Sequence, residues 1–366
     1  MSLSPINDFL ETAVEEGVFP GADLLVGLGE TVLLHNKYGS ATLVPEQEPL
    51  LNNTIFDLAS LTKPLATTLG IMALAEGGRL TLDRPFHPKE YPFLNPKISG
   101  MTVRHLLAHS SGLPAYQPYF ERLENETGIK KVILQDWIRR EPETVQPGTR
   151  TEYSDLGFMA LDWIFSEITG EDLDGWLRKN IYLPLGLTRL GFRPISISGV
   201  PDPGRYAPTE NCPWRRKILR GEVHDENAYA LGGISGQAGL FGTAFEIFKL
   251  IRTLKKAYDQ PRGSHLFNGK LVRQFWTRQT LPLNTSRALG FDTPSETDSS
   301  AGRFFSRLSV GHLGFTGTSF WLDLEKDLLI ILLTNRVHPT RANQKIKTFR
   351  PLVHDLIYQQ VSSLKI

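Results

Sequence analysis

The stretch of sequence that decides the fold runs from residue 56 to residue 64 and reads Phe56-Asp57-Leu58-Ala59-Ser60-Leu61-Thr62-Lys63-Pro64. An apolar run leads to Ser60, and the pattern predicts a helix that begins there or within a residue or two. Positions i and i+3 lie on one face of a helix, so the Ser60 hydroxyl and the Lys63 amine can meet. A serine hydroxyl becomes a good nucleophile when a neighbouring base takes its proton. A lysine is such a base only if burial or nearby positive charge lowers the pKa of its ammonium group.

The S-x-x-K pattern alone is weak evidence, because a capping serine followed by a surface lysine gives the same letters. A second element is needed to carry the proton to a leaving group. Tyr153, Ser154 and Asp155 stand immediately before a long apolar helix. A lysine cation beside Tyr153 would lower the pKa of the phenol, and the tyrosine would then accept the Ser60 proton and pass it on. A half-buried tyrosine in a capping loop is the plainer alternative.

A third element lies near the C-terminus, on an expected strand that reads Gly311-His312-Leu313-Gly314-Phe315-Thr316-Gly317-Thr318. A glycine-rich edge strand lets a substrate backbone approach closely. The Phe315 N–H would join the Ser60 N–H as a second donor to an oxyanion, and His312 would add a polar group beside Tyr153. The same glycines are also compatible with a plain β-bulge.

Together the three elements resemble the motifs of the serine β-lactamase, DD-peptidase and family VIII carboxylesterase superfamily, in particular its class C-like branch. S-x-x-K corresponds to Ser60 and Lys63, Y-x-N to Tyr153 and Asp155, and K-T-G to residues 312–314. Three further segments resemble the family, namely the lead into the nucleophile at 54–60, a hallmark segment at 102–114, and a glycine-rich loop at 232–241. The likeness covers nearly the whole chain.

The resemblance implies a role for each residue. Ser60 would be acylated, Lys63 and Tyr153 would share the proton transfers, and the backbone amides of Ser60 and Phe315 would form the oxyanion hole. Asp155, His312 and Gly314 would bind or orient the substrate. Neither a metal nor a cofactor is implied.

Two departures from the family pattern bear on the substrate. Asp155 replaces the usual asparagine; an ionised carboxylate cannot donate a hydrogen bond, but it can pair with Lys63. That pairing would raise the pKa of Lys63 and favour Tyr153 as the working base. His312 replaces the lysine of K-T-G, which removes a fixed positive charge and weakens recognition of a substrate carboxylate. Both changes favour a small ester over a penicillin.

The order of the expected elements predicts an α/β (α+β) fold of the β-lactamase/transpeptidase type, in which helices flank an antiparallel sheet. We expect one domain with a discontinuous α/β lobe, about 1–76 and 285–366, and a large helical insertion lobe, about 77–284. The strands are expected as a hairpin of 22–28 and 31–38 and as 306–311, 319–324 and 328–333. Helices are expected to begin at Ser4 and to cover 65–76, 103–109, 130–140, 154–169, 173–181, 244–258 and 348–361.

Composition narrows the class of partner. The 366 residues include 40 Lys and Arg against 39 Asp and Glu, a formal net charge of +1. This balance gives no argument for nucleic acid or an anionic membrane as partner. Cys212 is the only cysteine, so an internal disulfide is impossible. No stretch is apolar enough to span a membrane, and no signal peptide is recognisable. We therefore expect a cytoplasmic protein, or a periplasmic or secreted one if a signal peptide has been removed.

Two other polar groupings are less telling. His105 and His109 stand four residues apart, but without the glutamate of H-E-x-x-H they indicate a helix end rather than a metal site. The cluster from His224 to Asn227 would either line the cleft or hold a loop by hydrogen bonds.

Three functions follow in order of preference. The first is a serine hydrolase, carboxylesterase-like, that cleaves small esters or amides through an acyl-Ser60 intermediate. The second is a β-lactamase, D-amino-acid peptidase or DD-carboxypeptidase. The third, from another class, is an inactive binding protein that keeps the fold. The oligomeric state is not predicted.

Overall fold

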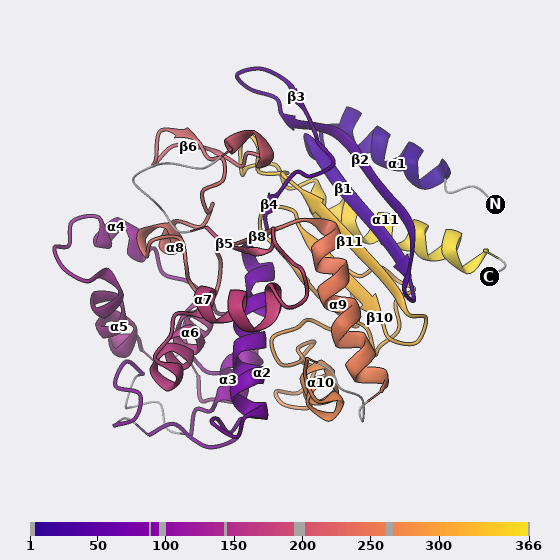
Figure 1. Ribbon diagram of the computed structural model, residues 1–366. Coiled ribbons are helices and arrows are strands. Elements are labelled where there is room, and N and C mark those ends of the chain that lie inside the picture. Colours follow the sequence, from indigo (N-terminus) through magenta and orange to yellow (C-terminus); the bar gives the residue numbers. More distant parts are fainter. Residues whose placement is uncertain are drawn as a thin grey trace.

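The computed structural model describes residues 4–87, 89–94, 100–142, 145–193, 202–260 and 266–364. Its centre is a six-stranded antiparallel sheet with the strand order β3-β2-β1-β11-β10-β9 (Figure 1). The first half of the sheet comes from the start of the chain and the second half from its end. The strands are β1 (Gly21–Leu28), β2 (Thr31–Thr42), β3 (Glu48–Pro49), β9 (Val310–Leu313), β10 (Ser319–Asp323) and β11 (Leu328–Thr334).

Both faces of the sheet are covered, which explains why β11 is a continuous apolar run. Alternate side chains of a strand point to opposite faces. Leu328, Ile330 and Leu332 pack in the cluster formed with α1 (Ser4–Glu15) and α11 (Ile346–Ser362). The side chains between them face the larger core, which includes α9 (Ala244–Asp259). Figure 1 shows α1 and α11 on one side of the sheet and α9 on the other.

The remaining helices lie in the part of the molecule beside α9 (Figure 1). They are α2 (Thr68–Glu76), α3 (Val103–Leu107), α4 (Tyr119–Leu123), α5 (Lys130–Arg140), α6 (Asp155–Thr169), α7 (Leu173–Leu177), α8 (Glu226–Ala230) and α10 (Gly269–Trp276). Short helical turns occupy η1 (Ala59–Leu61), η2 (Lys63–Thr67), η3 (Arg178–Tyr182) and η4 (Pro203–Arg205). Two small sheets complete the fold, one of β4 (Phe56–Asp57), β8 (Leu240–Gly242) and β5 (Gly191–Phe192), the other of β6 (Asn211–Cys212) and β7 (Lys217–Ile218).

Helix α6 is buried along most of its length and carries the second motif at its start. The Ser154 side chain accepts a hydrogen bond from the Gly157 N–H at 3.1 Å and caps the helix. Gly170 ends it in the left-handed conformation (φ 74°) that favours glycine. The glycine-rich loop lies directly on this helix, because a Cβ on Gly236 would stand 2.0 Å from the carbonyl oxygen of Phe158. The loop can therefore approach the first motif from the side of α6.

Most of the expected elements are confirmed, including the first hairpin and the helices at 130–140, 154–169 and 244–258. The expected strand at 306–311 is wrong at its start, since β9 begins only at Val310. The preceding segment turns instead, because the Ser306 N–H and hydroxyl both donate to the carboxylate of Asp323, at 2.8 and 2.9 Å.

Candidate functional site

The turn that carries Ser60 is held from behind by a buried carboxylate. Asp57, at the end of β4, accepts the Ala59 N–H at 2.8 Å and the His224 N–H at 2.6 Å. Ala59 has a positive φ of 48°, a conformation that costs a non-glycine residue free energy. The strained residue stands directly before Ser60, at the start of η1. Asp57 thereby stabilises the turn that presents the serine.

Lys63 lies one helical turn after Ser60 and is fully buried. Its Nζ donates to Ser60 Oγ at 3.2 Å, to Asp155 Oδ1 at 2.7 Å and to the carbonyl oxygen of Gln237 at 3.1 Å. Burial is the largest single influence and would lower the pKa of this amine, but the charges and hydrogen bonds of Asp155 and Tyr153 together outweigh it, so the pKa is raised. Lys63 is therefore a cation in the resting pocket, as its expected pairing with Asp155 requires.

Tyr153 completes the cluster. The Lys63 Nζ stands 4.9 Å from the centre of its ring, and Ser60 and Lys63 both act on its hydroxyl as hydrogen-bond partners. Burial raises the pKa of Tyr153, the Lys63 cation lowers it, and the Asp155 carboxylate raises it again. The net shift is upward. The Lys63 cation does lower the phenol pKa as expected, but the expected net lowering is wrong for the resting enzyme, because burial outweighs the cation.

His109 positions this tyrosine, a role that the sequence did not suggest. The His109 ring lies 4.4 Å from the Tyr153 ring, its Nδ1 accepts the Ser154 N–H at 3.0 Å, and its carbonyl accepts the Glu152 N–H at 2.8 Å. Burial, reinforced by the Arg287 cation, lowers the pKa of His109 well below its usual range. The other histidine, His105, forms part of the capping box of α3. Both rings thus have structural partners, in line with a helix end.

His312 lies on β9, with its ring centre 6.1 Å from that of Tyr153. Its Nδ1 donates to the Leu313 carbonyl at 2.8 Å, so in the neutral ring Nε2 carries the lone pair. Within the described part of the chain this buried Nε2 has no partner. Burial lowers the pKa of His312 to about 4. The imidazole is therefore uncharged at neutral pH, as expected for a position that lacks the fixed charge of a lysine.

The turn after β9 is fastened to the segment before Ser60. Thr316 Oγ1 donates to the Asp57 carbonyl at 2.8 Å, and Thr318 Oγ1 donates to the Leu58 carbonyl at 3.1 Å. Gly314 fits only because it has no side chain, since a Cβ there would stand 2.0 Å from Thr318 Oγ1. Arg336 donates to the Phe315 carbonyl at 2.6 and 2.9 Å. These contacts fix the turn that carries the second expected oxyanion donor.

A cavity of about 370 Å³ opens over Ser60. Of the expected site residues, Ser60, Tyr153, Asp155 and Phe315 line it, whereas Lys63, His312 and Gly314 do not. The structure adds five residues from three separate parts of the chain; three of them belong to the polar cluster at 224–227, and no sequence pattern indicated the other two. They are Tyr116, His224, Asp225, Glu226 and Arg341.

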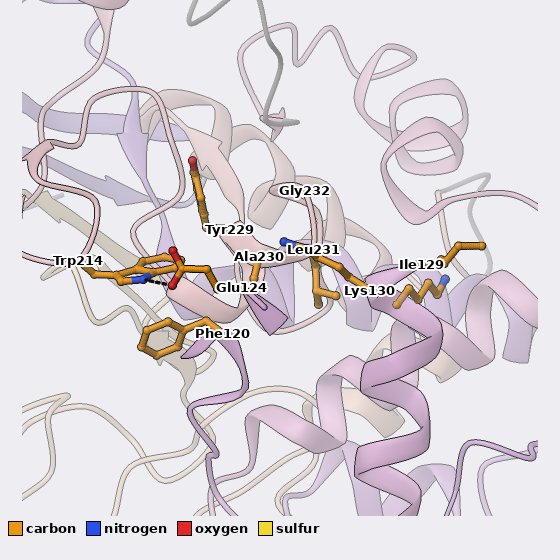
Figure 2. A pocket seen from close by; sticks show the side chains of 10 residues that line it. Phe120, Glu124, Ile129, Lys130, Trp214, Tyr229, Ala230, Leu231 and Gly232 are labelled. Carbon is orange, nitrogen blue, oxygen red and sulfur yellow. Dashed lines mark hydrogen bonds between the residues drawn. The ribbon is translucent and has the colours of Figure 1, made fainter. Parts of the chain in front are cut away.

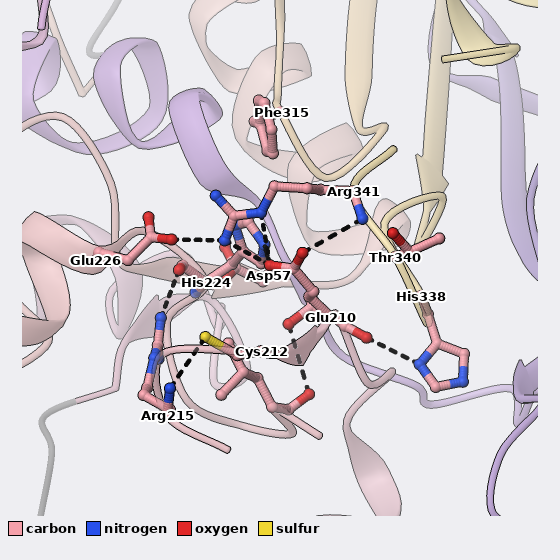
Figure 3. Close-up of polar contacts among 12 residues, drawn as sticks. Asp57, Glu210, Cys212, Arg215, His224, Glu226, Phe315, His338, Thr340 and Arg341 are labelled. Atoms are coloured by element: carbon pink, nitrogen blue, oxygen red, sulfur yellow. Dashed lines mark hydrogen bonds and ion pairs between the residues drawn. The ribbon is translucent and has the colours of Figure 1, made fainter. Parts of the chain in front are cut away.

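Charged side chains below this cavity form a continuous network (Figure 3). Arg341 bridges two carboxylates, with its Nε 2.6 Å from Glu210 and its Nη2 2.5 Å from Glu226. His224 Nε2 lies 3.1 Å from Glu210. Burial opposes ionisation of Glu210, but the hydrogen bonds from His224 and Arg341 lower its pKa to about 2. The polar cluster at 224–227 therefore does both things that the sequence left open, since it lines the cleft and holds the loop.

A second cavity of about 630 Å³ has an aromatic wall (Figure 2). Trp214 packs edge-on against Phe120, with ring centres 4.8 Å apart, and its indole N–H donates to Glu124 at 3.2 Å. Tyr229 from α8 also lines it, while Glu226 at the start of α8 lines the first cavity. One short helix thus contributes to both cavities.

Comparison with known proteins agrees with this geometry. A family model described as Beta-lactamase matches residues 6–354. The chain belongs to the beta-lactamase family. An Escherichia coli (strain K12) protein named "Putative D-alanyl-D-alanine carboxypeptidase" is 29% identical over 371 residues, which cover 93% of this chain and 84% of the relative. A protein of the same name from Salmonella agona (strain SL483) is 30% identical and covers 94% of this chain and 85% of the relative.

Solved structures of similar shape confirm the expected fold. The hydrolase EstCE1, described as having promiscuous acyltransferase activity, superposes with a TM-score of 0.72 at 19% identity and covers 95% of this chain and 98% of its own. A penicillin-binding protein homologue from Pyrococcus abyssi, described as octameric, gives a TM-score of 0.74 at 19% identity, over 98% and 78%. The protein is thus a serine hydrolase of the beta-lactamase fold. In the described part of the chain, no helix is long and apolar enough to cross a membrane.

The Asp57 contacts lead to a first prediction. An asparagine at this position would offer one acceptor oxygen where the aspartate offers two, so Asp57→Asn leaves a buried N–H unsatisfied. We expect the free energy of unfolding, measured by urea denaturation, to fall by about 1–3 kcal/mol. We also expect slower labelling of Ser60 by a fluorophosphonate, because the serine turn loses its support.

Asp323→Asn is the matched control, since Asp323 is equally buried and also accepts several hydrogen bonds, but far along the chain on β10. It should destabilise the fold without slowing the labelling of the folded enzyme. Equal labelling rates in the two variants would remove Asp57 from the positioning of Ser60.

Proposed function

We propose that the protein hydrolyses small esters or amides, esters preferentially, through an acyl-enzyme on Ser60. The observation that supports this most is the contact of 3.2 Å between Ser60 Oγ and the buried cation of Lys63, in a cavity that Tyr153 also lines. The preference for esters rests on His312, which is uncharged at neutral pH and gives a substrate carboxylate no fixed partner.

The raised pKa values suggest how the proton moves. Lys63 and Tyr153 both hold their protons in the resting pocket, so neither is a free base. We infer that Tyr153 relays the proton. As Ser60 Oγ bonds to the carbonyl carbon, its proton passes to the Tyr153 oxygen, and the tyrosine proton passes to the departing alkoxide, which leaves as an alcohol. The Lys63 cation stabilises the negative charge that develops on the phenol oxygen.

Deacylation runs the same relay in reverse. Water attacks the acyl carbon and gives a proton to Tyr153, which returns its own proton to Ser60 as the carboxylic acid leaves. In both steps the N–H groups of Ser60 and Phe315 would donate to the oxyanion. The contacts of Thr316, Thr318 and Arg336 that fasten the 314–318 turn support this role for Phe315.

A D-alanyl-D-alanine carboxypeptidase is the second candidate, because relatives that share 29–30% identity over most of the chain carry that name. Its substrate ends in a carboxylate. Arg341 is the cationic side chain that lines the cavity, but Glu210 and Glu226 already bind it. The charge of the cavity therefore favours the ester hydrolase.

The test combines labelling with turnover. A fluorophosphonate should form one covalent adduct, which peptide mass spectrometry places on Ser60. Short-chain p-nitrophenyl esters should be hydrolysed faster than a chromogenic cephalosporin or a D-alanyl-D-alanine peptide, with Ser60→Ala as the background. An adduct on another serine, or equal turnover by wild type and Ser60→Ala, would overturn the proposal. Faster release of D-alanine than of any ester would favour the second candidate.

A further inference from the structure

We propose that the substrate carries a protonated amine, and that Asp225 at the start of α8 binds this ammonium group. The inference rests on the proposed function, because it assigns a substrate class to the cavity over Ser60. The argument comes from the ionic partners of the groups that surround that cavity.

The carboxylates on the cavity wall differ in what balances their charge. Asp155 pairs with Lys63 at 2.7 Å. Glu226 shares Arg341 with Glu210, so this group of three keeps one negative charge in excess. Among the ion pairs of the described residues, Asp225 has none. With His224, which lies 3.1 Å from Glu210, in its neutral form, the excess is two negative charges, one from the Arg341 group and one from Asp225; with His224 protonated, the excess is the single charge of Asp225.

Asp225 is placed to receive a ligand. It caps α8 by accepting the Ala228 N–H at 2.7 Å, and the Gln237 side-chain amide donates to it at 3.3 Å. Both hydrogen bonds are accepted by Oδ1, so neither of these two neighbours occupies Oδ2. Burial raises the pKa of Asp225 to about 6, and the nearby Asp155 carboxylate adds to the shift. A cation from outside the protein would relieve both effects.

Tyr116, which also lines the cavity, is subject to the same negative charges. Burial raises the pKa of its phenol, and the carboxylates of Asp225, Glu226 and Asp155 raise it further. The three carboxylates therefore all make the electrostatic potential in the cavity over Ser60 more negative. The Tyr116 side chain also stays 43% exposed, and an aromatic face beside carboxylates is a favourable environment for an ammonium group.

Apart from Arg341, the arginines near this wall do not line the cavity. Arg287 stands 5.2 Å from the centre of the Tyr153 ring, but it is paired with Asp292. Arg215 turns its guanidinium to the carbonyls of Val223 and His224, at 2.7 and 2.6 Å, and does not line the cavity. A substrate with a carboxylate would meet the excess negative charge, and a substrate with an ammonium group would neutralise it.

The experiment compares esters of matched shape. Alanine methyl ester, in both enantiomers, is paired with methyl isobutyrate, and monomethyl methylmalonate supplies the carboxylate of the same shape. These three esters differ only in the group on the acyl side, which is a cation, uncharged or an anion. Acetylcholine carries a fixed cation on the leaving group, and 3,3-dimethylbutyl acetate is the uncharged ester of the same shape. We expect kcat/KM to be on the order of tenfold higher for the ammonium member of at least one pair, the factor of one charge-assisted contact.

Asp225→Asn should reduce that ratio to nearly one, because asparagine keeps the cap of α8 but loses the charge. Asp172→Asn is the matched control: Asp172 caps α7 through the Gly175 N–H at 2.8 Å, and it does not line the cavity. It should leave the ratio unchanged. A ratio near one in the wild type for both pairs, a preference for the carboxylate, or an equal ratio in Asp225→Asn would each overturn the inference.

The pH dependence gives a second readout. The groups that face Asp225 are Glu226 on its own helix, Asp155 on α6, Lys63 on η2, the phenol of Tyr116 and the side chain of Gln237. Because acetylcholine has a fixed charge, any change in its preference over 3,3-dimethylbutyl acetate comes from the protein. If the cation binds near the leaving group, the preference should rise as pH increases through about 6, where Asp225 ionises. Asp225→Asn should flatten this rise.

Binding of the esters to the Ser60→Ala variant distinguishes a failure of the proposed function from a failure of this inference. Calorimetry on that variant compares alanine methyl ester with methyl isobutyrate without any chemistry. If the wild type hydrolyses no ester but Ser60→Ala still binds the ammonium ester more tightly, the proposed function fails and the inference stands. If esters are hydrolysed without any ammonium preference in turnover or binding, the inference fails alone.

Discussion

Lys63→Met should lower the rate of Ser60 acylation by about 10²–10³-fold while the protein remains folded. Methionine matches the volume of lysine but removes the cation that Ser60 Oγ meets at 3.2 Å. If Tyr153 relays the proton, its oxygen becomes partly anionic in the transition state, and the Lys63 charge stabilises it. The measurement is the rate of p-nitrophenol release in a single turnover, with enzyme in excess over the ester, which isolates acylation.

Measuring the free energy of unfolding of the variants distinguishes this loss of catalysis from damage to the fold. Removal of Lys63 leaves the Asp155 carboxylate without its partner at 2.7 Å. Because the Asp155 side chain is 19% exposed, we expect the free energy of unfolding to fall by about 1–3 kcal/mol, the range for an unsatisfied polar group that is largely buried. The double variant Lys63→Met with Asp155→Asn removes the unpaired charge and should recover most of this loss. It should not recover acylation. A single variant that acylates within about threefold of wild type would remove Lys63 from the chemistry.

The sequence predicted which residues of the site contact one another, but it did not predict the direction of the pKa shift of Tyr153. The i, i+3 spacing placed Ser60 against Lys63, and the change from asparagine to Asp155 predicted the ion pair. The pKa of Tyr153 was predicted in the wrong direction because its shift depends on burial, which a local motif does not reveal. The Lys63 cation does lower it, but complete enclosure of the ring outweighs that contribution.

The strands and long helices were predictable because their apolar periodicity is local. The start of β9 was not, since the Ser306 turn depends on a carboxylate seventeen positions later, on β10. The same limit applies to the site. His109 supports Tyr153 across 44 positions, and Asp57 holds the His224 backbone across 167. No rule of sequence spacing predicts such contacts. The segment 102–114, which contains His109, could be singled out only by its resemblance to the family.

The cavity wall shows this limit most clearly. Asp225, Glu226, Tyr116 and Arg341 come from three separate parts of the chain that no motif connects, and only the fold brings them to the cavity over Ser60. The motifs therefore identify the reaction, while residues outside the motifs set the charge that a substrate meets.

Tyr153→Phe should lower acylation by about 10²–10⁴-fold, the contribution typical of a positioned acid or base. Phenylalanine keeps the ring that packs 4.4 Å from His109 and 4.9 Å from Lys63, so the cluster stays assembled. Only the hydroxyl is lost, and with it the relay between Ser60 and the leaving group. The effect should be largest for alkyl esters, whose alkoxides need a proton to leave, and smaller for p-nitrophenyl esters, whose phenolate leaves without one.

This dependence on the leaving group distinguishes a relay from a structural role. Tyr116→Phe is the matched control, because Tyr116 lines the same cavity and its pKa is set by burial and by carboxylates rather than by Lys63 or Ser60. It should slow alkyl and p-nitrophenyl esters alike, and only slightly. If Tyr153→Phe also slows both classes by one common factor, the hydroxyl does not protonate the leaving group. Lys63 would then have to carry the proton itself, against the pairing with Asp155 that raises its pKa.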